Sequence, residues 1–156
     1  MNKHQVFDAL RQKLETELNT AVGASKDAAD YATNEESRAE SKYDTQGLEA
    51  SYLAAGQASI ANTLVDALST LNSLEDEMTA PRDRVMRGAL FECDLGGMKE
   101  WFYMAPVGGG ETLELDGVEI SILTAKSPLG QSIAGKSTSA SFRLPNGLDG
   151  RIVQVL

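Results

Sequence analysis

The chain has 156 residues, 42% of them hydrophobic, and its 23 acidic and 14 basic residues give a formal net charge of −9. This length allows one ordinary domain or two small ones, and the composition is typical of a folded chain rather than a disordered one. A charge of −9 disfavours contact with nucleic-acid phosphates, so we expect no direct sequence-specific DNA binding.

Cysteine and histidine are too scarce for most metal and nucleophilic sites. Cys93 is the only cysteine and His4 the only histidine, which leaves no material for a disulfide framework, a multi-Cys zinc site or a well-placed Ser-His-Asp triad. No apolar run approaches the ~20 residues that cross a bilayer, and the start of the chain lacks the blocks of a secretory signal. We therefore expect a cytoplasmic protein with no membrane partner and no stably bound cofactor.

The first part of the chain predicts a long amphipathic helix over about residues 4–33. Apolar or small side chains recur every three or four residues, which marks one face of a helix. These are Phe7, Leu10, Leu14, Leu18, Ala21, Ala24 and Ala28. The pattern stops after Ala32, and the polar segment that follows predicts a reversal of the chain near residues 34–44.

A second stripe predicts another long helix over about residues 45–78. Its members alternate steps of three and four residues, which is a heptad seam. They are Ala50, Leu53, Gln57, Ile60, Leu64, Ala67, Leu71 and Leu74. Two such helices joined by a polar reversal predict an antiparallel coiled coil, with helices of ~45 and ~50 Å. Since Pro81 ends the second helix, we assign residues 1–80 to this hairpin.

After Pro81 the hydrophobic period changes toward two, which predicts a β-rich domain over residues 81–156. Short segments rich in β-branched and aromatic residues alternate with glycine-containing turns, at 84–93, 99–107, 118–125, 139–144 and 150–156. Ser127 suits the N-cap of a short helix, Pro128 its first position and Gly135 its end. The prediction is an α+β protein whose second domain is an antiparallel sheet of four or five strands with one helix.

The segment ISILTAKSPLGQSIAGK, residues 120–136, is followed by a strand, a turn and GRIVQVL. It resembles the C-terminal domain of the Gre transcription elongation factors, a bacterial family. The matching positions are Ser127, Pro128, Ile133, Gly135 and Lys136. The resemblance implies an FKBP-like C-terminal domain without prolyl isomerase activity, next to an N-terminal coiled coil. It also implies a regulator rather than an enzyme.

In Gre factors the coiled coil enters the secondary channel of RNA polymerase, and carboxylates at its tip help to hold a metal ion for cleavage of backtracked RNA. Residues 35–44 of this chain read EESRAESKYD. Glu36 precedes Tyr43 by seven residues, as the family's Asp precedes its Tyr, whereas Glu40 falls one position from the family's Glu. The resemblance thus implies that Glu35, Glu36, Glu40 and Asp44 share a Mg²⁺ ion with the polymerase.

The C-terminal domain also carries candidate partner-binding residues. Lys126, Ser127, Pro128 and Lys136 are the expected partner-binding residues, the two lysines facing an acidic surface. We expect a monomer, because a seam within one chain leaves little reason to dimerise.

Three hypotheses remain open at this point. The chain stimulates RNA cleavage, it only obstructs the polymerase channel, or it is a coiled-coil interaction module unrelated to transcription. The acidic segment also fits a solvated helix reversal, with Arg38 and Lys42 offsetting its charge. A self-contained hydrolase is disfavoured because we find no nucleophile–base pair.

Overall fold

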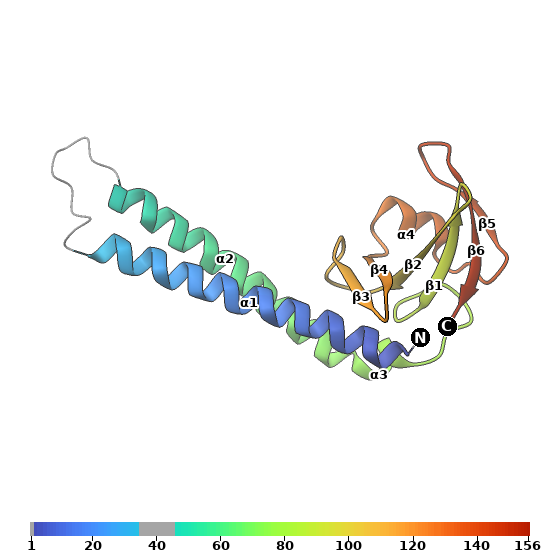
Figure 1. Cartoon of the computed structure of the whole chain (residues 1–156), viewed down its shortest axis with the longest axis horizontal. Helices are drawn as coiled ribbons and strands as arrows, with labels where there is room; N and C mark the ends of the chain where they lie inside the picture. Colours follow the sequence, from blue (N-terminus) through green and yellow to red (C-terminus); the bar gives the residue numbers. More distant parts are fainter. Residues whose placement is uncertain (1, 35–45) are drawn as a thin grey trace. The chain divides into compact units, whose positions relative to one another are not determined.

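The computed structural model describes residues 2–34 and 46–156. Two long helices come first, α1 (Lys3–Thr33) and α2 (Gln46–Ser73), and a short helix α3 (Glu75–Thr79) follows (Figure 1). Another short helix, α4 (Pro128–Ile133), lies among the strands β1 (Leu90–Leu95), β2 (Met98–Met104), β3 (Thr112–Leu115), β4 (Val118–Leu123), β5 (Ser141–Arg143) and β6 (Asp149–Val155). The predicted α+β class, with two long helices before a sheet that carries a short helix, is confirmed. No helix in this described part is both long and apolar enough to span a membrane.

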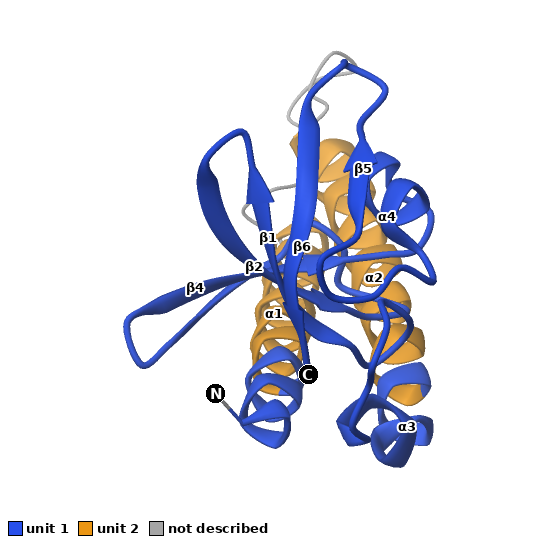
Figure 2. Ribbon diagram, turned by 90° about the vertical axis from the view of Figure 1, so that its right-hand side faces the viewer, with its two compact units in different colours: residues 1–11, 70–156 blue, residues 12–69 orange. Residues whose placement is uncertain are grey.

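The chain divides into two compact units, drawn in different colours in Figure 2. One unit comprises residues 1–11 and 70–156, and the other comprises residues 12–69. Both long helices therefore pass from one unit into the other. The unit that holds the sheet includes the first turns of α1 and the last turn of α2, which a division at Pro81 assigns to the hairpin. Val6, Phe7 and Leu10 are fully or almost fully buried in this unit.

The six strands form one sheet in the order β3-β4-β2-β1-β6-β5. Strands β2 and β4 pair in parallel, with Phe102 opposite Ser121, whereas the other neighbouring strands are antiparallel. The sheet thus differs from the expected four or five antiparallel strands. The reason is β3, whose four residues give too short a pattern to recognise. It returns the chain before β4, so that β4 runs in the same direction as β2.

The β3–β4 hairpin turns at Asp116 and Gly117, with φ angles of 53° and 75°. Two successive residues in the left-handed region are the requirement of the tight turns that match strand twist. An Asp-Gly pair meets that requirement at low cost, since glycine has no Cβ and aspartate tolerates the region. The sequence therefore contains the signal for this turn, whereas the four-residue strand before it is too short to give a clear alternating pattern.

Alternate residues of the central strands are buried on opposite faces of the sheet. Phe91 and Phe102 belong to one core, where their rings stack at a centroid distance of 5.7 Å, and Ile133 of α4 is buried in the same core. Leu90 and Tyr103 have the opposite parity and are also fully buried. The Tyr103 hydroxyl donates to the carbonyl oxygen of Met78 in α3. Both faces of the sheet are therefore covered, one by α4 and the other by helical residues of the same unit.

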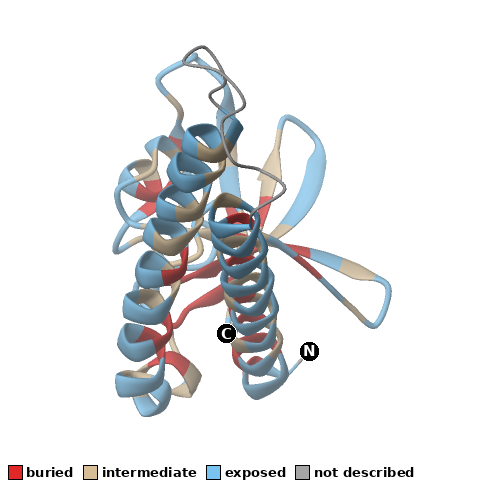
Figure 3. Ribbon diagram, turned by 90° about the vertical axis from the view of Figure 1, so that its left-hand side faces the viewer, coloured by how far each residue is buried: buried red, intermediate tan, exposed pale blue. Residues whose placement is uncertain are grey.

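The predicted stripe of α1 is confirmed. Its members are buried or half-buried along the whole helix: Phe7, Leu10, Leu14, Leu18, Ala21, Ala24 and Ala28. Figure 3 colours the ribbon by burial and shows buried and half-buried patches along the long helices between exposed stretches. The antiparallel pairing with α2 follows from two hydrogen bonds, Ser25 Oγ to the Ala54 carbonyl at 3.0 Å and Tyr31 Oη to Gln46 Oε1 at 3.2 Å.

The predicted seam of α2 is partly wrong. Leu53 and Ile60 are 56% and 49% exposed, whereas Ala61 and Leu68 are buried. Gln57, Leu64 and Leu71 belong to the predicted seam and also to the face of α2 that is buried in the structure, and they are buried or half-buried. With 3.6 residues per turn, apolar residues flank these three on both sides of the helix, with Leu53 and Ile60 on one side and Ala61 and Leu68 on the other. The rotation of α2 toward α1 decides which side is buried.

Candidate functional site

The four tip carboxylates, Glu35, Glu36, Glu40 and Asp44, lie outside the described residues, so their metal-holding role stays a prediction. The sequence places them between the end of α1 and the start of α2. Within residues 2–34 and 46–156, no cluster of three or more His, Cys, Asp or Glu side chains is arranged to hold a metal ion.

The turn before α4 has the capping geometry that the sequence predicts. Ser127 Oγ accepts a hydrogen bond from the Gly130 amide at 3.0 Å and donates one to the Thr124 carbonyl at 2.9 Å, and Pro128 opens the helix. A Cβ atom at Gly130 would lie 2.1 Å from the Thr124 oxygen. The Ser127 hydroxyl therefore acts as both donor and acceptor within the turn. This serine holds the segment in place, while the exposed Pro128 and Lys126 present side chains to the outside.

Backbone hydrogen bonds attach the end of α4 to the segment after Pro81. The Val85 amide donates to the Lys136 carbonyl at 2.7 Å, and the Gly135 amide donates to the Val85 carbonyl at 2.8 Å. Gly135 has a φ of 75°, as expected for a residue that closes a helix. Arg84 pairs with Ser137 in an isolated bridge. The basic residues Arg84 and Lys136, which belong to distant segments of the chain, are thus brought to the same part of the sheet unit.

A cleft of about 430 Å³ lies beside the predicted partner-binding segment. Its lining residues are Arg87, Met104, Ala105, Pro106, Thr124, Ala125 and Lys126. Lys126 was expected from the sequence, but Arg87 was not, because 39 positions separate the two residues along the chain. The cleft therefore combines two basic residues, Arg87 and Lys126, with an apolar floor that includes Met104 and Ala105. No acidic residue is among its described lining residues.

Within residues 2–34 and 46–156, Lys3 is the one buried charged residue, at 8% exposure. Its ammonium donates to the carbonyl oxygens of Ala80 and Leu156, the second at 3.1 Å. Burial and the nearby Arg82 guanidinium lower the pKa of Lys3 to about 8. Lys3 therefore links the start of α1 to Ala80, the residue after α3, and to Leu156, the residue after β6.

Two further buried groups have raised pKa values. Burial raises the pKa of the Cys93 thiol to about 12, with smaller contributions from the carboxylates of Glu100 and Glu92. Burial also raises the pKa of Tyr103 above its ordinary value. The nucleophilic form of a cysteine is the thiolate, so Cys93 is an unreactive core thiol at neutral pH.

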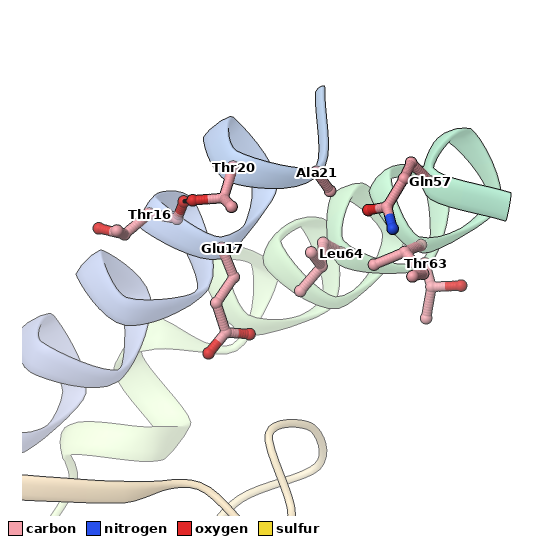
Figure 4. A pocket seen from close by; sticks show the side chains of 8 residues that line it. Thr16, Glu17, Thr20, Ala21, Gln57, Thr63 and Leu64 are labelled. Carbon is pink, nitrogen blue, oxygen red and sulfur yellow. Dashed lines mark hydrogen bonds between the residues drawn. The ribbon is translucent and has the colours of Figure 1, made fainter. Parts of the chain in front are cut away.

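A second hollow, of about 470 Å³, lies between the two long helices (Figure 4). Residues of α1 and α2 line it: Thr16, Glu17, Thr20, Ala21, Gln57, Ile60, Thr63 and Leu64. It belongs entirely to the unit of residues 12–69. Ile60, which the predicted seam buries between the helices, lines this hollow and is 49% exposed.

These features define a class of protein in which a long antiparallel helix pair precedes a mixed sheet with a short, serine-capped helix. No model of a known protein family matches the chain, and no curated protein matches it.

Solved structures of one transcription factor are similar to it over nearly their whole length. The crystal structure of GreA factor homolog 1 (Gfh1) of Thermus thermophilus is 18% identical, with 96% of this chain and 94% of that chain covered and a TM-score of 0.35. A structure of the transcription factor Gfh1 is 22% identical, with coverages of 96% and 92% and a TM-score of 0.38. That of Thermus aquaticus Gfh1 is 18% identical, with coverages of 99% and 96% and a TM-score of 0.36.

Proposed function

We propose that this chain is a cytoplasmic bacterial regulator of transcription elongation that binds RNA polymerase and inserts its hairpin into the secondary channel. It acts as a monomer and is not itself an enzyme. Its tip carboxylates take part in the polymerase's own cleavage of backtracked RNA by sharing a Mg²⁺ ion. The proposal rests on the residues of this chain and on their resemblance to the Gre pattern.

The observation that carries the proposal is the antiparallel pairing of α1 and α2 together with what their connection contains. Helix α1 has 31 residues and α2 has 28, which correspond to lengths of about 46 and 42 Å. Four carboxylates lie within residues 35–44, between these helices. A long, narrow helix pair with acidic residues in its connection suits delivery of carboxylate ligands into a confined channel.

The capped turn before α4 supports the same proposal from the other end of the chain. The Gre resemblance is concentrated in residues 120–136, and those residues form a strand, a Ser-Pro cap and a short helix closed by Gly135. The motif is thus a structural unit as well as a sequence pattern.

Two experiments test the proposal. Tagged protein is used to recover partners from a bacterial lysate, where we expect the polymerase subunits. RNA cleavage is then measured in a stalled, backtracked complex with and without the protein. Stimulated cleavage supports the metal-sharing role, whereas binding with slowed transcription and unchanged cleavage supports obstruction of the channel. Failure to recover polymerase contradicts both.

A coiled-coil interaction module is the second candidate, and a specific observation favours it. Leu53 and Ile60 expose about half of their surfaces on one side of α2, and Ile60 lines the hollow of Figure 4. Exposed apolar side chains at helical spacing are typical of surfaces that bind a helix. Reproducible recovery of a partner other than polymerase, lost in Leu53→Ser/Ile60→Ser, supports this function.

A further inference from the structure

We propose that the cleft between the end of β2 and the turn before α4 binds a carboxylate-bearing segment of the polymerase surface. Arg87 and Lys126 contact the carboxylate, and Met104, Ala105 and Pro106 contact an apolar side chain beside it. This inference rests on the proposed function, because that function supplies the partner. It adds the chemistry of the contact and a residue, Arg87, that belongs to no sequence motif.

The charge distribution is the first support. The chain carries a net charge of −9, yet this cleft is lined by two basic residues and, within the described residues, by no acidic one. Lys126 is exposed, and its ammonium has no ion-pair or hydrogen-bond partner in the described part of the chain. A local positive site on an acidic protein selects partners by charge complementarity.

Arg87 has unused donors for a carboxylate. Its Nη1 lies 3.4 Å from Glu77 Oε2, and both side chains are substantially exposed. Exposed ion pairs of this kind contribute little and exchange readily with solvent or a partner. The guanidinium carries five N–H donors in a planar fork that matches the two oxygens of a carboxylate. Arg87 can therefore bind a partner carboxylate while keeping its contact with Glu77.

The walls of the cleft are held by backbone hydrogen bonds, so the site exists before a partner arrives. The Met104 amide donates to the Ala89 carbonyl, the Gly88 amide to the Met104 carbonyl and the Ala105 amide to the Leu123 carbonyl, each at 2.9 Å. On the other wall, Gln131 Nε2 donates to the Lys126 carbonyl at 2.7 Å. A preformed site loses little conformational entropy on binding.

The apolar floor favours a protein segment over a nucleic acid. Met104 and Ala105 are almost fully buried, and Pro106 is half-buried above them. Such a floor suits an aliphatic side chain next to the acidic one. Binding of a phosphate backbone depends on many basic contacts and is opposed by the net charge of the whole chain. An acidic protein surface is therefore the occupant that this cleft fits.

The test uses the full chain and purified RNA polymerase core enzyme, with affinity measured at low and high salt. Arg87→Glu/Lys126→Glu replaces both cations by carboxylates, which repel the partner's carboxylate. We therefore expect binding at low salt to weaken about tenfold or more. The matched control is Lys99→Glu/Arg151→Glu, which changes the net charge equally at exposed basic residues outside the cleft. It should weaken binding by no more than about twofold. Arg87→Lys/Lys126→Arg should retain most of the affinity.

A second readout detects the carboxylate directly. A carbodiimide joins the Lys126 amine to a carboxylate in contact with it, with loss of one water molecule and formation of an amide. Mass spectrometry of the complex should find Lys126 linked to an Asp or Glu of a polymerase subunit. Circular dichroism checks that each variant is folded, and Arg87→Gln/Lys126→Gln replaces the charge reversal if that variant unfolds.

The outcomes separate this inference from the proposed function. Equal affinities of the cleft variant and its control, or no cross-link from Lys126 in a formed complex, overturn the cleft while polymerase binding stands. Loss of affinity only when RNA is present assigns the cleft to nucleic acid and also overturns it. No binding of the unmodified protein to polymerase overturns the proposed function and, with it, this partner.

Discussion

The Tyr103 hydroxyl donates a hydrogen bond of 2.9 Å to the carbonyl oxygen of Met78, and both residues are fully buried. This bond joins the middle of the sheet to the short helix α3, which directly follows α2. Both residues belong to the unit of residues 1–11 and 70–156, so the sheet and the helical residues around Met78 are parts of one compact unit.

The first prediction concerns this bond. Tyr103→Phe removes the donor and leaves the Met78 oxygen buried without it, which should lower the free energy of unfolding by about 1–3 kcal/mol. The measurement is denaturant unfolding followed by circular dichroism. The control is Tyr52→Phe, since Tyr52 is 69% exposed in α2. Similar small losses for both variants would show that the buried bond contributes nothing.

The second prediction is a pH dependence that arises from Lys3. Its pKa is lowered from 10.5 to about 8 in the folded chain, so between pH 8 and 10.5 the unfolded chain binds more protons at this group. The contribution of Lys3 to the unfolding free energy must therefore rise with pH across that window. The stability of wild type minus that of Lys3→Met should increase from pH 7.5 to 9.5.

The raised pKa values of Cys93 and Tyr103 act in the opposite direction above about pH 9, because these groups lose protons earlier in the unfolded chain. They are present in both proteins and cancel in the difference. Lys26→Met, at an exposed position of α1, provides the matched control. A difference between wild type and Lys3→Met that stays constant or falls with pH would refute the buried, desolvated state of Lys3.

The third prediction distinguishes the two sides of α2. Leu68 is 8% exposed and Ile60 is half-exposed, so Leu68→Ala should cost about 2–5 kcal/mol and Ile60→Ala less than about 1 kcal/mol. Thermal or denaturant unfolding of the two variants measures the difference. The reverse order of losses would restore the seam expected from the heptad spacing.

The fourth prediction uses two glycines of opposite surroundings. A Cβ at Gly130 meets the Thr124 backbone oxygen at 2.1 Å, whereas a Cβ at Gly56 in α2 meets nothing within 4 Å. Gly56→Ala should therefore stabilise the chain by up to about 1 kcal/mol through helix propensity. Gly130→Ala should destabilise it by at least about 1 kcal/mol, because backbone must shift. A neutral Gly130→Ala would mean that the backbone of the turn before α4 moves away from the added Cβ at little cost.

The fifth prediction concerns the tip carboxylates. If Glu36 and Glu40 hold a metal ion with the polymerase, Glu36→Gln/Glu40→Gln should abolish stimulated RNA cleavage while polymerase binding is kept, since the amide retains the shape but loses the charge. Asp27→Asn/Asp30→Asn, at exposed positions of α1, is the charge-matched control. Cleavage rates are measured at several Mg²⁺ concentrations beside the affinity of each variant.

Retained stimulation by the Gln variant would exclude a metal-holding role for these two residues. If the unmodified protein inhibits without stimulating cleavage, the obstructing hypothesis applies. Inhibition should then change much less in the Gln variant, because obstruction depends on the bulk of the helix pair and only partly on its charge.

Several features follow from local sequence alone, because neighbouring residues cause them. The stripe of α1 narrows from Leu to Ala and is buried as predicted, and it has few apolar residues on its other faces to compete. The cap at Ser127, the first helical position of Pro128 and the positive φ of Gly135 are also local. Each depends on one residue type and its immediate backbone, so sequence spacing is enough to predict it.

Other features were decided only when distant segments packed together. The rotation of α2 depends on which of two apolar sides meets α1, and the heptad spacing fits both. The parallel pairing of β2 with β4 depends on β3, a four-residue strand with a weak pattern of its own. Lys3 contacts Ala80 and Leu156, and Tyr103 bonds to Met78, across separations of 25 to 153 positions along the chain. Arg87 and Lys126, which are 39 positions apart, line the same cleft. Such contacts depend on how buried surfaces fit in three dimensions, which one-dimensional spacing does not specify.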